Sequence, residues 1–325
     1  MIWGLKDAEE IRKSVTVELQ RKIQRAYEGL YREIAEKAKR LSGEGRVSEA
    51  EIILFEKEIE QRVKSINEEI KLGIVSSMSR ASNAVVDDTR EQLLNQGFKY
   101  QDVSSAFVYV PDDIVRSIIS GQVYGNGWTL SKSIWGHNKD FNDKLSELIG
   151  KGVATGKSSQ DVAKDLEQFV NPKLRTSSRH IKFREYLRDE NGNFVLDENG
   201  NRIPTGKIED FYFGNIDYNA QRLARTLISH AYQQSFERMY RKNPFVTSYV
   251  WHSSGQHGRT CEICLERDGK HFEKDKLPLD HPNGMCWFEA YSPYTSDEIS
   301  DMMVKWYNSP SGTYPEIDEF INDFR

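Results

Sequence analysis

The chain has 325 residues, and its 45 Lys and Arg stand against 50 Asp and Glu, which gives a formal net charge of −5. This charge excludes a general basic field, so any contact with nucleic acid must come from a local cluster. Charged residues make up 29% and hydrophobic residues 38% of the chain, which is too apolar for a disordered protein and typical of long helices with one narrow buried face.

Cysteine content and the lack of long apolar runs predict the compartment. Three cysteines cannot all pair in disulfides, which favours a reducing compartment. The first ten residues lack the cationic and apolar regions of a signal peptide, and no run approaches the roughly 18 apolar residues of a membrane span. We therefore expect a soluble protein that is made in a cytoplasm and has no membrane partner.

The N-terminal part is predicted to be helical. Apolar residues recur at spacings of three and four from residue 5 to about 41 and again from 52 to 74, which predicts two amphipathic helices. Ser48 with Glu51 three residues later is a capping box for the second helix. The short connection predicts an antiparallel helical hairpin that packs on a partner or on the rest of the chain. Residues 80–97 predict a further helix.

The middle of the chain predicts shorter helices and then a basic segment. Helices are expected from Pro111, at about 138–150 and at 162–170. The segment 173–188 concentrates cations against the single acid Glu185. These cations are Lys173, Arg175, Arg179, Lys182, Arg184 and Arg188. Several cations on one short segment act together on phosphate groups, so this is the predicted nucleic-acid contact. The alternative is a basic loop that pairs with the protein's own acids.

A small internal repeat predicts a β-hairpin at about 186–213. Asp189-Glu-Asn-Gly-Asn193 and Asp197-Glu-Asn-Gly-Asn201 both contain Asn-Gly, which favours the positive φ angles of tight turns. A calcium-binding loop is the alternative. The ligand order and the closing Glu of an EF-hand are missing, so the hairpin is favoured.

The C-terminal half combines a helix, two β-rich runs and an acidic end. Residues 216–241 have helical periodicity, whereas 245–251 and 287–291 are rich in β-formers. The final segment is acidic, and we expect its aromatic residues to anchor it on the chain's own body or on a neighbour. These aromatic residues are Trp306, Tyr307 and Tyr314.

Together these elements predict an α+β fold. A long α-helical N-terminal hairpin or arm is expected over residues 1–127. A compact mixed α+β C-terminal domain with a β region clipped by cysteine and histidine follows at 128–295, and an acidic C-terminal tail occupies 296–325.

All three cysteines lie within one short stretch, Arg259-Thr-Cys-Glu-Ile-Cys264 followed by His281-Pro-Asn-Gly-Met-Cys286. Thiolates at Cys-x-x-Cys spacing plus a His and a Cys around a turn are a typical zinc donor set. The predicted ligands are Cys261, Cys264, His281 and Cys286. Four protein ligands leave no position for water or substrate, so we expect a structural zinc ion.

Other interpretations of this stretch stay open. The cysteines could be buried thiols around a tight turn, with His281 capping a backbone group. A redox Cys-x-x-Cys is less favoured, because such a motif normally sits at a strand-to-helix start. A zinc hydrolase or nuclease would have nearby candidates for acid–base roles. These are His252, His257, His271, Glu262 and Glu266. No His-Glu-x-x-His, Gly-rich phosphate loop or Gly-x-Ser-x-Gly motif is present, so we expect no enzyme activity.

The pattern Trp251…Arg259-Thr-Cys-x-x-Cys264…Asp268-Gly269…Phe272…Pro278…His281-Pro-Asn…Cys286 resembles the signature of the phage Mu F-like head morphogenesis, or minor capsid, proteins. Gly156-Lys-Ser-Ser-x-Asp-Val-Ala and Leu223-Ala-Arg-Thr226 resemble two upstream motifs of that family, so the resemblance covers about residues 130–292.

Three positions depart from the family pattern. The family has a Glu where Leu227 stands, and an Asp where His257-Gly258 precede the Arg-Thr-Cys run. It often has a further cysteine where Gly284 stands, so this chain has four ligands rather than five. The first two departures weaken the inheritance of any catalytic role.

The resemblance implies a minor capsid protein of a tailed bacteriophage, present in few copies at the portal vertex inside the procapsid. It would assist head assembly and DNA delivery, with the host cytoplasm as its site of assembly. The implied partners are the portal protein, the major capsid or scaffolding protein, and packaged DNA. The alternative is an enzyme carried in the virion, either one that acts on nucleic acid or, given the family's link to an ADP-ribosyltransferase-like fold, an ADP-ribosyltransferase-like enzyme. Such an enzyme would need an open metal position or a pocket that joins Arg225 with an acid. Because the chain ends shortly after the signature, we expect no fused toxin domain.

Overall fold

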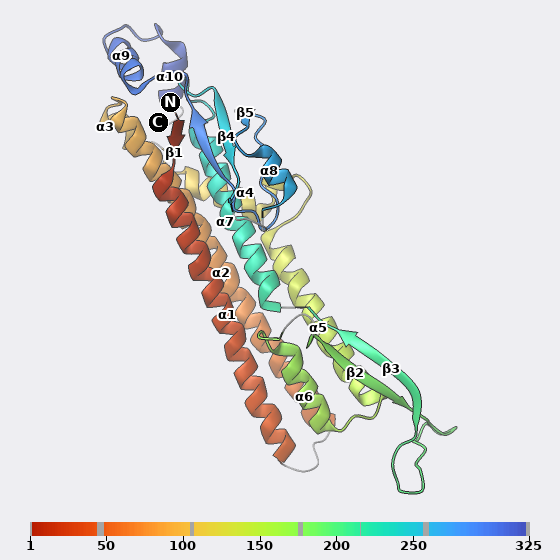
Figure 1. The fold of residues 1–325 in the computed structure, drawn as a ribbon. Helices are drawn as coiled ribbons and strands as arrows, with labels where there is room; N and C mark the ends of the chain where they lie inside the picture. Colours follow the sequence, from red (N-terminus) through yellow and green to blue (C-terminus); the bar gives the residue numbers. More distant parts are fainter. Residues whose placement is uncertain are drawn as a thin grey trace. The chain divides into compact units, whose positions relative to one another are not determined.

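The computed structural model describes residues 2–43, 49–104, 107–174, 178–214, 216–255 and 260–322. Long N-terminal helices precede a mixed region of helices and sheet (Figure 1). With 62% of residues in helices and 12% in strands, the chain has the predicted α+β class. Among the described residues, none of the helices combines the length and the apolar character that a membrane crossing requires.

The chain forms two compact units, and each is assembled from separated segments. Unit 1 consists of Met1–Gln20, Leu72–Ser131 and Arg222–Arg325. Unit 2 consists of Arg21–Lys71 and Lys132–Gln221. Each unit therefore takes residues from both halves of the chain.

The first two helices are α1, Lys6–Gly43, and α2, Glu49–Asn95. The sequence predicted two helices where the single 47-residue helix α2 runs, and that prediction is wrong. Residues 75–80 contain neither Gly nor Pro, so nothing in the backbone forces a break there. Gly73 lies within α2, and a Cβ there would be 2.6 Å from Leu19 Cδ1, so the glycine lets the two helices approach closely at this point.

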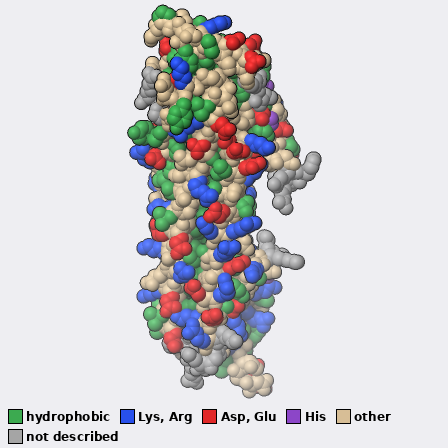
Figure 2. Space-filling model, turned by 90° about the vertical axis from the view of Figure 1, so that its left-hand side faces the viewer, with side chains coloured by type: hydrophobic (Ala, Val, Ile, Leu, Met, Phe, Trp, Pro, Cys, Tyr) green, Lys and Arg blue, Asp and Glu red, His purple; other side chains and the backbone are tan. Residues whose placement is uncertain are grey.

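Helices α1 and α2 are antiparallel, as predicted. Arg80 pairs with Glu18 at 2.8 Å in unit 1, and Arg62 pairs with Glu33 at 3.2 Å in unit 2. The later residue of α2 thus pairs with the earlier residue of α1, which shows that the two helices run in opposite directions. The predicted apolar stripes are buried along both helices from Val15 to Ile34 and from Ile52 to Ile74, whereas Ile11 at the start of the first stripe is exposed. Lys, Arg, Asp and Glu are interspersed on the face shown in Figure 2, as expected for solvated helix surfaces. Ser48 of the predicted capping box lies outside the described residues.

Unit 2 adds two helices and a two-stranded antiparallel sheet. Its helices are α5, Leu130–Ala154, and α6, Ser159–Val170, where Ser158 caps α6 by accepting a hydrogen bond from the Asp161 N–H. Its strands are β2, His180–Tyr186, and β3, Pro204–Tyr212. The predicted hairpin is confirmed, but its first strand begins at His180, inside the segment noted for its cations.

The repeated Asp-Glu-Asn-Gly-Asn sequences form two matching turns beyond the hairpin strands. The carboxylate of Asp189 accepts hydrogen bonds from the N–H groups of Asn191 and Asn193. In the second repeat, the carboxylate of Asp197 accepts from the N–H groups of Asn199 and Asn201. The glycine of each repeat has a positive φ, 82° at Gly192. The acids thus satisfy local backbone groups, as Asx turns do.

Unit 1 contains a four-stranded antiparallel sheet of order β1-β6-β4-β5. The strands are β1 (Ile2–Gly4), β4 (Ser248–His252), β5 (His271–Glu273) and β6 (Trp287–Tyr291). Runs 245–251 and 287–291 were predicted as strands, and they form the central pair. The pairing of the N-terminal strand β1 with β6 has no signal in the sequence.

Helices surround this sheet. They are α3 (Tyr100–Val103), α4 (Val110–Ser120), the 3₁₀ helix η1 (Gln122–Tyr124), α7 (Ile216–Tyr240), α8 (Glu262–Arg267), α9 (Ser296–Tyr307) and α10 (Pro315–Asn322). The core of unit 1 is aromatic, with Trp251 and Phe288 fully buried and their ring centroids 4.9 Å apart. Burying one such side chain contributes about 1.5–3 kcal/mol.

The acidic C-terminal segment docks on the chain's own body, one of the two predicted outcomes. Met303 on α9 and Phe320 on α10 belong to the apolar core of unit 1. The Tyr307 hydroxyl donates to the Asp102 carboxylate at 2.8 Å, and the Trp306 indole donates to Asp318 at 2.9 Å. The aromatic residues are therefore anchors, as the sequence indicated.

Candidate metal centre

The cysteines and His281 come together beside the two central strands of the unit 1 sheet. Cys261 is the N-cap of α8, and Cys264 lies in its first turn. His281 and Cys286 belong to the loop that enters β6. Cys264 Sγ lies 3.3 Å from Cys286 Sγ, and Cys261 Sγ lies 3.2 Å from His281 Nε2. The four predicted ligands cluster closely enough to bind a metal ion.

The turn between His281 and Cys286 sets the direction of both side chains. The Gly284 N–H donates to the His281 carbonyl at 2.9 Å, and Asn283, the third residue of the turn, has a φ of 70°. Proline at the second position and a positive φ at the third are the features of a type II turn. The Pro-Asn-Gly turn predicted from the sequence is therefore confirmed.

Helix α7 holds this turn in place. The Thr226 hydroxyl accepts a hydrogen bond from the Asn283 N–H at 2.8 Å, and Arg225 donates to the Asn283 side-chain oxygen at 3.0 Å. The resemblance to the Ala-Arg-Thr motif thus falls on residues that support the turn.

Asp280 holds the ligand loop together through hydrogen bonds to its carboxylate, and the sequence analysis predicted no role for this residue. Its buried carboxylate accepts hydrogen bonds from the N–H groups of His281 at 2.9 Å and Cys286 at 3.2 Å. A Cβ at position 284 would lie 2.1 Å from an oxygen of this carboxylate, so the loop closes only around a glycine.

His230 on α7 fixes the start of the same loop. Its Nδ1 lies 2.8 Å from the Tyr124 hydroxyl, and its Nε2 lies 2.9 Å from the Asp280 carbonyl. A carbonyl only accepts, so Nε2 carries the proton and Nδ1 accepts from the tyrosine. Burial lowers the pKa of His230, which favours this neutral form.

Arg12 of α1 also supports the ligand loop. Its fully buried guanidinium donates to the carbonyls of Cys286 at 3.1 Å and Met285 at 3.2 Å. It also lies 4.8 Å from the centroid of the Tyr232 ring. No carboxylate among the described residues forms an ion pair with it, and its Nε has no hydrogen-bond partner there. A buried cation without an acid is unfavourable unless negative charge lies nearby.

The ring orientation of His281 suits a metal ligand. Its Nδ1 lies 3.0 Å from the Pro282 carbonyl and donates to it, so the lone pair of Nε2 is directed at Cys261. Metal-binding histidines almost always donate their second ring N–H to a carbonyl or carboxylate. Burial alone would lower the pKa of His281, but the Pro282 carbonyl, Asp280 and Cys261 together raise it.

The thiols differ in acidity. The Cys264 N–H and His281 lower the pKa of the exposed Cys261. Burial raises the pKa of Cys264 above its usual range, and it raises that of Cys286 to about 11. A metal ion would have to displace protons from the two buried thiols, and its charge would supply the driving force.

The position of the Cys-x-x-Cys pair corrects one prediction. We expected the motif to lie away from a helix start, yet Cys261 is the N-cap of α8. The short helix α8 has six residues, too few for an apolar periodicity that would indicate its start in the sequence. The placement removes that objection to redox chemistry, but the nearby imidazole still favours a metal set.

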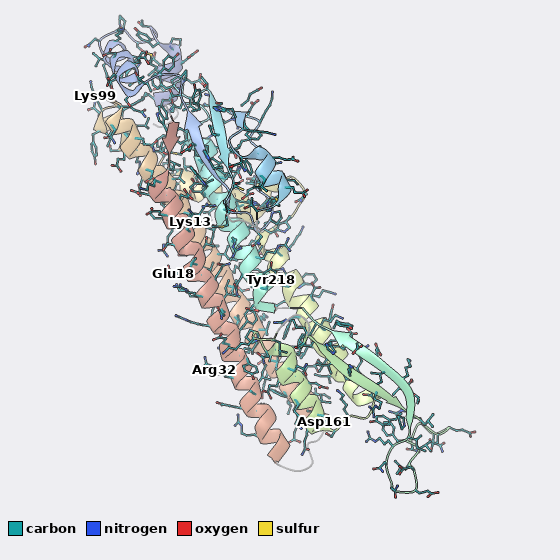
Figure 3. All side chains as sticks on the ribbon, viewed as in Figure 1. Lys13, Glu18, Arg32, Lys99, Asp161 and Tyr218 are labelled. Atoms are coloured by element: carbon teal, nitrogen blue, oxygen red, sulfur yellow. The ribbon has the colours of Figure 1, made fainter. Side chains whose placement is uncertain are left out.

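A cavity of about 710 Å³ adjoins the cluster. Cys261 and His281 line it, as do Arg225, Glu9 and Lys13, which is labelled on α1 in Figure 3. Glu9 forms an ion pair with Lys13, and Arg225 is held by Asn283. The cavity therefore joins Arg225 with an acid, as the enzyme alternative requires.

Four of the other candidate acid–base residues are described in the structure, and none of these four lines this cavity. His252 pairs with Glu289 at 2.7 Å and stacks on Trp287 at 4.0 Å, and His271 contacts the Ser248 hydroxyl at 2.9 Å. Glu262 and Glu266 are exposed on α8. His257 lies outside the described residues.

The structure separates the six cations of the basic segment. Arg179 is buried and donates to the carbonyls of Pro172, Leu174 and Gly214, so it holds loops together and is not free for phosphate contact. Arg188 donates to the carbonyls of Gly192 and Ala154 and stacks on Phe194. Arg188 is exposed, as are Lys173, Lys182 and Arg184, and Arg175 lies outside the described residues.

No protein-family model, curated protein or solved structure matches this chain at a significant level. The interpretation of the metal centre therefore rests on the chain's own geometry. No role of the metal centre is transferred from another protein.

Proposed function

We propose that the chain is a non-enzymatic head morphogenesis protein of a tailed bacteriophage, whose unit 1 sheet is stabilised by a structural zinc ion. The observation that carries the zinc proposal is the convergence of three sulfurs and one imidazole whose second nitrogen is already engaged. Three thiolates and one histidine are a donor set that zinc prefers. The phage role is supported by the resemblance of the motif around these residues.

A metal ion here would act as a structural clip. It would join α8, which follows β4, to the loop that enters β6, and β4 and β6 are neighbouring strands. Four protein ligands would leave no open coordination position, so the ion would stabilise the fold and would not activate water.

The biological role follows from the resemblance and from the helical hairpin. The expected location is the interior of the capsid at the portal vertex, with the portal protein and a major capsid or scaffolding protein as partners. Exposed apolar side chains on α2, among them Leu54 and Leu72, offer contact area for such partners.

Metal analysis of the purified chain tests the zinc proposal. We expect one equivalent of zinc, and we expect its loss in Cys264→Ser and Cys286→Ser. The matched control is His271→Ala, which removes an imidazole outside the cluster. Substitution with cobalt then reports the number of thiolate ligands through its charge-transfer bands. Purified protein without zinc that loses no stability on chelation would refute the proposal.

Co-purification tests the phage role. The tagged chain should be recovered with a portal oligomer from cells that assemble heads. The reference is a heads-free culture that expresses the same chain. Recovery without any capsid component in both cultures would contradict the assignment.

The cavity that joins Arg225 with Glu9 favours one second candidate, an ADP-ribosyltransferase-like enzyme. Release of nicotinamide from NAD would support it if Glu9→Gln abolishes that release in a folded protein. We expect no such activity, because both side chains already have partners.

A further inference from the structure

Unit 2 contains a basic hollow that the metal centre and the proposed assembly role do not explain. It has a volume of about 510 Å³ and lies between the start of α6, strand β2 and the hairpin loop. Five cations and two acids line it, so the lining carries three more positive than negative charges. The cations are Lys157, Lys164, Lys182, Arg184 and Arg202, and the acids are Asp161 and Asp165.

Strand β2 presents two of these cations together. Ile181 and Phe183 are buried, and because side chains alternate along a strand, Lys182 and Arg184 face the opposite, open side. Neither side chain has an ion pair or a hydrogen bond with another described residue, although both backbones take part in the β2–β3 ladder. Asp210 stands opposite Lys182 in the antiparallel register, yet the two make no ion pair among the described residues.

The remaining cations form a fixed frame around this pair. Lys157 pairs with Asp165 at 2.5 Å and lies 4.3 Å from the Phe183 ring centroid. Arg202 lies 4.2 Å from the Phe194 ring centroid and donates to the Gly156 carbonyl. These contacts hold the positive groups in place before any ligand arrives, which lowers the entropy cost of binding.

The acids of the hollow are already occupied. Asp165 is paired with Lys157, and Asp161 lies 3.8 Å from Lys164. Asp161, labelled at the start of α6 in Figure 3, also closes the helix end with Ser158. The N–H groups of the helix end are therefore not the anion site. The positive charge of the hollow that no acid neutralises among the described residues is that of Lys182, Arg184 and Arg202, and Arg202 is already engaged by the Gly156 carbonyl and the Phe194 ring.

We propose that this hollow binds the phosphate groups of a nucleic-acid backbone. Lys182 and Arg184 are two positions apart on a strand, so their Cα atoms lie about 7 Å apart. Charge spread along an open edge suits a chain of phosphates, whereas a single phosphate ion needs donors that converge. The proposed phosphate site does not depend on the metal centre. Unlike the basic segment predicted from the sequence, it excludes Arg179 and Arg188 and includes Lys157, Lys164 and Arg202 from other parts of the chain.

Salt-dependent binding to duplex DNA tests this proposal. Fluorescence anisotropy of a labelled duplex is measured over a range of KCl concentrations for the full chain and for Lys182→Ala/Arg184→Ala. We expect the double variant to bind about tenfold more weakly or worse. Its slope of log affinity against log salt should be smaller in magnitude by about 2, because each lost phosphate contact removes about one released counterion.

The matched control is Lys64→Ala/Lys139→Ala, which removes the same charge from exposed helix positions in unit 2. The charge-retaining variant Lys182→Arg/Arg184→Lys should keep most of the binding. Circular dichroism and thermal unfolding show whether each variant is folded.

Three outcomes would overturn the proposal. The full chain could fail to bind DNA, or the control variant could weaken binding as much as the hollow variant. Inorganic phosphate could also bind at the hollow, detected by calorimetry, while DNA does not, which would make it a small-anion site.

Discussion

Replacing Arg12 with methionine tests whether the buried guanidinium serves the metal centre or only the fold. Arg12 donates to two carbonyls of the ligand loop, at 3.1 and 3.2 Å. Each lost hydrogen bond from a charged donor costs about 1.5–3 kcal/mol, so the loss of both bonds costs roughly 3–6 kcal/mol. Methionine keeps most of the apolar contact of the arginine stem.

Metal binding should change this cost. Zinc with three thiolates and one neutral histidine carries a net charge of −1, which Arg12 would partly compensate. Without metal the inner thiols stay protonated, because burial raises their pKa, and the guanidinium has no counter-charge. Removing an uncompensated buried charge returns part of the lost stability. We therefore expect a loss of about 3 kcal/mol with zinc and about 1 kcal/mol without it.

Thermodynamic linkage converts this difference into zinc affinity. A difference of about 2 kcal/mol corresponds to roughly a 30-fold weaker zinc affinity. Urea unfolding with saturating zinc and with a chelator gives the two stabilities, and competition with a chromophoric chelator gives the affinity. Arg25→Met, at an exposed position of the same helix, is the control. An unchanged zinc affinity with equal stability losses in both conditions would refute charge compensation, whereas a wild-type chain without zinc would refute the metal proposal itself.

Further substitutions address the turn, the hairpin and a buried acid. Gly284→Ala should lower the free energy of unfolding by about 2 kcal/mol and weaken zinc binding, because the new Cβ would collide with the Asp280 carboxylate. Competition with a chelator measures the zinc affinity, and an affinity equal to that of the wild type would contradict this prediction. Gly156→Ala should destabilise unit 2 by about 2 kcal/mol, since the residue has a φ of 68° and its Cβ would lie 2.2 Å from Phe194, and unchanged urea unfolding would count against this contact. Burial raises the pKa of Glu237 to about 7, so the folded state holds a proton that the unfolded chain, with a pKa near 4.5, has lost. The free energy of unfolding should therefore fall as pH rises from 4.5 through 7. Glu237→Gln should be more stable than the wild type by about 1–2 kcal/mol above pH 7 and by almost nothing near pH 4.5. Equal gains in stability at both pH values would contradict the raised pKa of Glu237.

Local patterns predicted much of the secondary structure. Helix α7 and the strands β4 and β6 follow from apolar periodicity and β-formers over short windows. The hairpin follows from its Asn-Gly turns. Local patterns failed where the outcome depended on a distant contact. Leu19 of α1 approaches Gly73 within α2, a contact that no window of α2 reveals.

The candidate ligands could be predicted because metal-binding spacing is a local property of the chain. Their support could not, since Arg12 and Cys286 are 274 positions apart and only folding joins them. The basic segment shows the same limit. Arg179 and Lys182 look alike in the sequence, yet one is buried on carbonyls and the other is exposed on a strand.

The sequence by itself determined the α+β class, the antiparallel helical hairpin, the β-hairpin and the set of four candidate metal ligands. Each depends on residues a few positions apart, where periodicity and turn chemistry act directly. Only the tertiary structure decided that β1 completes the sheet, that Asp280 and Arg12 hold the ligand loop, and which cations remain free. The physical reason is that burial and hydrogen-bond partners are set by segments far apart in the chain, and the local pattern of residues carries no record of which segments will meet.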